Sequence, residues 1–129
     1  MPHLNLCLKL LAPVFLVVGG LHLCLGLAAE NLLGANLPIE VLTNATLDSQ
    51  NRFYGVAFTL YGILLWLCAS DLPKYSTVLR RILAVSFASG LARVLSMVML
   101  GLPSPMVMAL LTSELLLPPL LWLWMKRVV

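Results

Sequence analysis

The chain has 129 residues, of which 61% are hydrophobic and only 10% are charged, and its formal net charge is +3. Soluble domains carry a charge on about a quarter of their residues, which keeps their surface in contact with water. This composition excludes an ordinary soluble domain and indicates a protein whose main solvent is lipid. The small, scattered positive charge gives no reason to expect a nucleic-acid partner.

Four apolar segments are long enough to cross a membrane as helices, which requires about 20 residues each. No set of segments alternates with the period of two that a membrane barrel needs. We therefore expect an all-α fold, a single four-helix transmembrane bundle over residues 1–129, because backbone in lipid must satisfy its own hydrogen bonds. The predicted spans are residues 8–29, 51–70, 77–101 and 104–126, and residues 30–50 form a long loop after the first span.

The first span resembles a signal peptide, but its apolar run is longer than a typical signal sequence, so we interpret it as a retained span. Cysteine and tyrosine aside, His22 is the ionisable residue that lies well within this span, with Gly19 and Gly26 near it at helical spacing. A charge in mid-bilayer costs about 2.5–3.5 kcal/mol, so an ionisable residue there is a candidate for function. The alternative for His22 is a hydrogen-bonded packing residue.

The loop over residues 30–50 mixes apolar residues with Pro38 and Glu40. Such a segment is expected to lie on the membrane surface or to fold over the bundle. Asp48 is predicted to be the N-cap of the second span. Arg52 follows Asp48 by four residues, so an ion pair at the outer mouth is expected.

The second span opens with polar residues and continues with small ones. Asn51 and Arg52 have two interpretations: they hold an anionic headgroup, or they bond the helix ends. Small and polar residues then recur on one helical face, with Thr59 among them and Tyr61 nearby. Glycines in such a pattern usually allow close helix contact, and this is the simpler explanation of them.

The third and fourth spans are joined by the short sequence at 102–105, so we expect antiparallel neighbours. Arg93 lies eight residues before Gly101, and Glu114 lies ten residues after Ser104. These separations place both side chains roughly 12–15 Å below the same surface. The two are therefore expected to meet as an ion pair. Such a pair has two interpretations, a functional site or a structural contact that fixes the register of the helices.

Polar residues also recur around Arg93 at intervals of three and four, which predicts one polar face on the third span. In the fourth span, Pro118 lacks an amide hydrogen and should leave the carbonyl of Glu114 free. These faces and His22 are expected to converge on a polar centre at a similar depth. The residues of the predicted stripe are Ser86, Ser89, Arg93 and Ser96.

The distribution of lysine and arginine predicts the orientation, since basic residues favour the cytoplasmic side. The long loop carries acidic residues, whereas most basic residues lie at the other ends of the spans. We therefore expect both termini in the cytoplasm and the long loop outside. The basic residues concerned are Lys9, Lys74, Arg80, Arg81, Lys126 and Arg127.

Three stretches carry a resemblance to a known family: Asn-Arg-Phe-Tyr-Gly at 51–55, Gly-Leu-Ala-Arg to Leu-Pro-Ser-Pro at 90–105, and Glu-Leu-Leu-Leu-Pro-Pro at 114–119. Together they resemble small four-span bacterial membrane proteins of a family of unknown function, broadly similar to DoxX-like proteins. The resemblance covers nearly the whole chain. It implies a four-helix fold in the bacterial inner membrane, but no reaction. Some DoxX-like proteins are small subunits of quinone-linked oxidoreductases, which implies an accessory role as an alternative.

The leading hypothesis is a non-enzymatic inner-membrane protein with a polar pocket that binds a lipid, a quinone or another small amphiphile. The alternatives are an accessory or assembly subunit of a larger membrane complex, and a proton or solute transporter that works as an oligomer. Enzymatic activity is the least supported, because no nucleophile is paired with a base, and no motif indicates a cofactor or metal. Membrane lipids are the expected partners. The candidate site residues are His22, Asn51, Arg52, Thr59, Tyr61, Ser89, Arg93, Ser96 and Glu114.

Overall fold

The computed structural model describes residues 2–129, which form only helices, turns and short connections. Four helices are long and apolar enough to cross a membrane, as predicted. They are α1 (Pro2–Leu25), α4 (Ala45–Ser70), α5 (Leu72–Leu100) and α6 (Pro105–Val128). Three short elements lie between α1 and α4: a 3₁₀ turn at Gly26–Ala28, α2 (Ala29–Leu32) and α3 (Ile39–Leu42).

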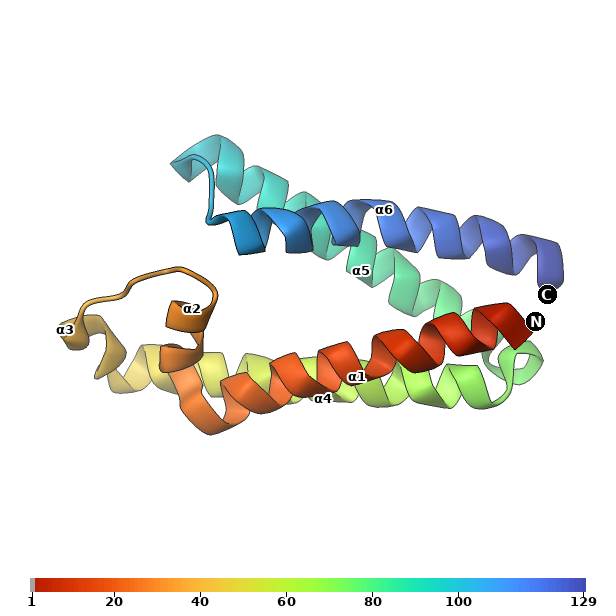
Figure 1. Ribbon diagram of the computed structural model, residues 1–129, viewed down its shortest axis with the longest axis horizontal. Helices are drawn as coiled ribbons and strands as arrows, with labels where there is room; N and C mark the ends of the chain where they lie inside the picture. Colours follow the sequence, from red (N-terminus) through yellow and green to blue (C-terminus); the bar gives the residue numbers. More distant parts are fainter. Residues whose placement is uncertain (1) are drawn as a thin grey trace.

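The long helices form two antiparallel pairs, α1 with α4 and α5 with α6 (Figure 1). Both termini and the α4–α5 turn lie at one end of the molecule, where the two pairs come together. Toward the other end the pairs diverge (Figure 1). The hydrophobic core occupies the end with the termini, and it includes Leu4, Leu8, Leu65, Leu72, Leu79, Leu121 and Met125.

Close contact between α1 and α4 depends on glycines that lack a side chain. A Cβ atom added at Gly19 would lie 2.5 Å from Thr59 Oγ1 and 2.7 Å from the carbonyl oxygen of Gly55. A Cβ atom added at Gly55 would lie 2.8 Å from the carbonyl oxygen of Gly19. The backbones of the two helices therefore approach through these small residues, a common contact between helices in membranes.

Helix boundaries differ from the predicted spans at the polar ends. The N-cap of α4 is Asn44, whose side chain accepts from the amides of Thr46 and Leu47, so the prediction that Asp48 is the N-cap was wrong. Both residue types make good caps, and hydropathy does not detect the polar first turn of this helix. Likewise, α5 begins with Asp71 as its N-cap rather than at residue 77.

The connection between α1 and α4 folds over the end where the helix pairs diverge (Figure 1). Gly26 turns the chain with a φ of 62°. The amide of Leu27 then donates to Asp48 Oδ1 at 2.9 Å, which ties the start of the connection to α4. Farther along, Ser104 Oγ donates to the carbonyl oxygen of Leu33 at 2.6 Å. These bonds anchor the connection to both pairs of helices.

Replacing Ser104 by alanine is expected to loosen this connection. The variant loses the bond to Leu33, and the net contribution of one such bond is about 1 kcal/mol, equivalent to about fivefold faster amide exchange over residues 33–37. Hydrogen exchange measured by mass spectrometry checks this. Ser104→Asp keeps an N-cap acceptor for α6 but lacks the donor, so it should loosen the connection equally. Unchanged exchange in both variants would contradict this role for the serine.

Candidate functional site: a cavity between the two helix pairs

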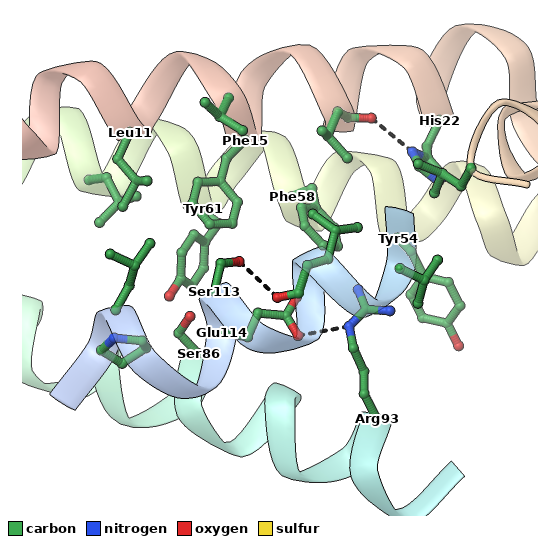
Figure 2. Close-up of a pocket in the computed structure, with 18 of the residues that line it drawn as sticks. Leu11, Phe15, His22, Tyr54, Phe58, Tyr61, Ser86, Arg93, Ser113 and Glu114 are labelled. Carbon is green, nitrogen blue, oxygen red and sulfur yellow. Dashed lines mark hydrogen bonds and ion pairs between the residues drawn. The ribbon is translucent and has the colours of Figure 1, made fainter. Parts of the chain in front are cut away.

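A cavity of about 300 Å³ lies between the two pairs of helices and receives side chains from all four long helices and from α2. This volume lies at the lower end of the range for small-molecule sites, about 300–1,000 Å³. Figure 2 shows its labelled residues: His22, Tyr54 and Arg93 lie toward one end, and Leu11 toward the other. The polar end lies under the α1–α4 connection, since Glu30 and Leu33 of that connection also line the cavity.

Arg93 of α5 and Glu114 of α6 meet in this cavity. Arg93 Nε donates to Glu114 Oε2 at 2.7 Å, and the carboxylate side chain is only 12% exposed (Figure 2). The pair forms because a short connection makes α5 and α6 neighbours and places both residues at a similar distance from it. A charged hydrogen bond of this length is among the stronger polar contacts in proteins.

Glu30 of α2 holds a second polar cluster in the cavity. Its Oε1 atom lies 3.2 Å from His22 Nε2 and accepts from Asn51 Nδ2 at 2.7 Å. The other ring nitrogen of His22, Nδ1, donates to the carbonyl oxygen of Val18 at 2.8 Å (Figure 2). The cluster therefore joins α1, α2 and α4.

Asn51 has one unused polar atom. The residue is 9% exposed, and its Oδ1 atom has no hydrogen-bond partner within the described residues 2–129. A buried carbonyl oxygen without a partner costs about 1–3 kcal/mol. Asn51 lines the cavity through other atoms, since this oxygen has almost no accessible surface.

Aromatic rings line the middle of the cavity (Figure 2). The ring of Phe15 lies 5.9 Å from that of Phe58 and 4.7 Å from that of Tyr61, measured between centroids. The hydroxyl of Tyr61 donates to the carbonyl oxygen of Ile82 at 2.9 Å, which fixes the ring against α5. The cavity therefore passes from charged groups through aromatic rings to aliphatic side chains such as Leu11.

Of the nine candidate residues, the structure brings five to the cavity: His22, Asn51, Tyr61, Arg93 and Glu114. Arg52 lies outside it and pairs with Asp48 at 2.8 Å, as the spacing predicted. Its Nη1 atom also donates to the carbonyl oxygens of Leu23 and Cys24, at 2.7 and 3.0 Å. Arg52 therefore binds the C-terminal end of α1, which was the structural alternative.

The other three candidates have local contacts. Thr59 donates to the carbonyl oxygen of Gly55 and packs against α1. Ser89 is exposed and donates to the carbonyl oxygen of Ser86. Ser96 is exposed as well. The four residues of the predicted stripe therefore do not share one face of α5. At about 100° per residue, Ser89 and Ser96 lie to one side of the line through Ser86 and Arg93.

Sequence reasoning missed Glu30, which contacts two of the candidate residues. Its position in the long loop gave no sign of its depth, and only the folding of that loop brings it to His22 and Asn51. Ser113 also lines the cavity. In the sequence, its position next to Glu114 could have identified it as a candidate.

No metal site is visible in the part of the chain that the structure describes, where no three histidine, cysteine, aspartate or glutamate side chains gather. The cavity instead offers a charged hydrogen-bonding end, aromatic rings and an aliphatic end. This arrangement suits a ligand with a polar head and an apolar body.

The fold and the cavity define a multi-pass protein with four candidate membrane-spanning helices and a polar-ended internal cavity. The chain belongs to the family described as Domain of unknown function (DUF4345), whose model matches residues 3–125. This match covers nearly all of the four long helices. It agrees with the predicted resemblance to a family of unknown function. No curated protein and no solved structure matches the chain.

Proposed function

We propose that this protein binds a small amphiphile, such as a lipid or a quinone, in the cavity between its two helix pairs. The proposal rests on one observation. The lining of a single cavity changes from the Arg93–Glu114 ion pair at one end to aliphatic side chains at the other. The aliphatic part of the cavity borders the hydrophobic core, since Leu65, Leu83 and Leu121 belong to both. The proposed role is binding rather than catalysis.

The proposed location is the bacterial cytoplasmic membrane, with both termini inside. Basic residues support this orientation: Lys9 is in the first third of α1, Lys74 is near the start of α5 and Lys126 is near the end of α6. These parts of the three helices lie toward the end of the bundle that holds the termini (Figure 1). The opposite end carries Glu30 and Glu40. Because basic residues favour the cytoplasmic side, the α1–α4 connection is placed on the outer side. The Arg93–Glu114 pair would then lie within the outer half of the bilayer.

Filling the cavity is expected to expel the ligand. Ser113→Phe places a ring in the cavity, and overpacking costs about 1–3 kcal/mol, which corresponds to roughly a tenfold loss of occupancy. Native mass spectrometry of gently extracted protein measures the bound small molecule. Thr112→Phe is the matched control, because Thr112 is the adjacent residue on α6 and is exposed.

The outcomes separate the candidate functions. A small molecule retained by wild type and Thr112→Phe but lost by Ser113→Phe supports the proposal. Equal retention by both variants contradicts it. A protein partner in fixed stoichiometry with no small molecule would instead favour the accessory-subunit role that the DoxX-like resemblance implies, and a homo-oligomer without ligand would favour transport.

A further inference from the structure

The hydrogen bonds of His22 determine how many protons its cluster holds. A backbone carbonyl only accepts, so the bond from Nδ1 to Val18 requires a hydrogen on Nδ1. On the other side, Nε2 faces the carboxyl oxygen Oε1 of Glu30 at 3.2 Å. Two acceptors cannot bond without a hydrogen between them. With one proton between Nε2 and Oε1, as imidazolium and carboxylate or as imidazole and carboxylic acid, His22 and Glu30 together have no net charge.

The cavity as a whole is then neutral. Arg93 and Glu114 form the other charged pair, and their charges also cancel. Within the described residues, the histidine, acidic and basic side chains that line the cavity are only these two pairs. An anionic ligand would add an unpaired negative charge beside Glu114, whose side chain is only 12% exposed, and this is costly.

Hydrogen-bonding capacity nevertheless remains at the polar end. Arg93 uses Nε for Glu114, and within residues 2–129 its Nη1 and Nη2 atoms donate to no protein atom. Those two atoms carry four N–H groups. A neutral acceptor on a ligand can bind them without separating Arg93 from Glu114. A zwitterion, in contrast, would compete with the existing ion pair for both of its partners.

The remaining cavity favours a flat hydrophobic ring. Phe15, Phe58 and Tyr61 line its middle, between the charged groups and Leu11 (Figure 2). Aromatic rings pack on one another in stacked and edge-on arrangements, which adds about 0.5–1.5 kcal/mol beyond the area buried.

We infer that the ligand is a neutral ring amphiphile whose head carries a carbonyl-type acceptor for the free N–H groups of Arg93. This inference rests on the proposed function and narrows it, because it rejects anionic lipid headgroups.

Three probes with one ring system test the inference. They are 2-acetylnaphthalene, which is a neutral ketone; naphthalene-2-carboxylate, which is anionic; and 2-ethylnaphthalene, which has no acceptor. Binding to the protein in nanodiscs is measured by equilibrium dialysis, as the excess over empty nanodiscs of the same lipid. The ketone is expected to bind about tenfold more tightly than the carboxylate or the ethyl compound, since hydrogen bonds from charged groups are strong.

The variant for this test is Arg93→Leu with Glu114→Leu, which leaves no unpaired charge. It should bind the ketone and the ethyl compound equally, whereas Ser89→Leu, the matched surface change on α5, should keep the tenfold preference. A carboxylate that binds tightest, or a ketone no better than the ethyl compound, overturns the inference but leaves the cavity as a binding site. If no probe binds above empty nanodiscs, the inference is wrong. If native mass spectrometry also shows no retained molecule, the proposed function is wrong as well.

Discussion

Replacing Arg93 alone by leucine is expected to destabilise the protein by about 3 kcal/mol, because removal of one partner leaves a buried charge without compensation. Glu114 is the charge left behind, and its side chain is only 12% exposed. Within residues 2–129, the hydrogen bond from Arg93 Nε is the one that this carboxylate accepts. The free energy of unfolding is measured by titration with SDS in mixed micelles, followed by tryptophan fluorescence.

Replacing both residues by leucine is expected to cost less than either single change, within about 1 kcal/mol of wild type, since apolar residues of similar volume often substitute for a buried pair. The four proteins form a double-mutant cycle, whose coupling energy isolates the interaction. Ser89→Leu, exposed on the same helix, is the control and should leave stability unchanged. A double variant less stable than both single variants would show that each residue has a partner of its own.

A tolerated double variant also separates binding from stability. If the pair serves only to fix the register of α5 and α6, the double variant should keep the bound molecule while it keeps the fold. If the pair receives the ligand, the same variant folds and loses the preference for a ketone. The comparison addresses the two interpretations of the pair that composition and spacing leave open.

Much of the fold could be predicted because lipid leaves the backbone few alternatives. An apolar segment of about 20 residues in a bilayer must be helical. The contact of Arg93 with Glu114 could also be predicted from the sequence. A connection as short as residues 102–105 makes the two helices that it joins neighbours. Both predictions depend on local chain properties.

The cluster around Glu30 could not be predicted, because it depends on tertiary contacts of an irregular segment. Bonds from Leu27 to Asp48 and from Ser104 to Leu33 hold this connection over the cavity. No periodic pattern encodes such bonds. The pairing of α1 with α4 across a long connection was likewise visible only as a pattern of small residues.

The polar stripe on α5 shows a limit of helical spacing. Residues three and four apart share a face only approximately, since each step turns the chain by about 100°. Ser86 and Arg93, seven residues apart, stay nearly in line and both reach the cavity. Ser89 and Ser96 fall to the side, and whether that side meets a neighbour depends on where α6 lies.

Gly19→Ala is expected to separate α1 from α4 at their closest contact. The added methyl would lie 2.6 Å from the backbone nitrogen of Thr59 and 2.7 Å from the carbonyl oxygen of Gly55, so backbone rather than a flexible side chain must move. Overpacking of this kind costs about 1–3 kcal/mol. The SDS titration that measures the Arg93 variants reports this loss of stability.

Gly20→Ala provides the control at the adjacent position. A Cβ atom there meets nothing within 4 Å, so the substitution adds only the helix preference of alanine, worth up to about 1 kcal/mol. Gly20→Ala should therefore be as stable as wild type or slightly more stable. Equal stability of the two variants would mean that α1 and α4 can move apart without cost.

The expected loss of stability at Gly19 alone would instead show that backbone contact holds α1 on α4. That contact keeps His22 beside Asn51, so Gly19→Ala should also weaken ligand binding although Gly19 does not line the cavity.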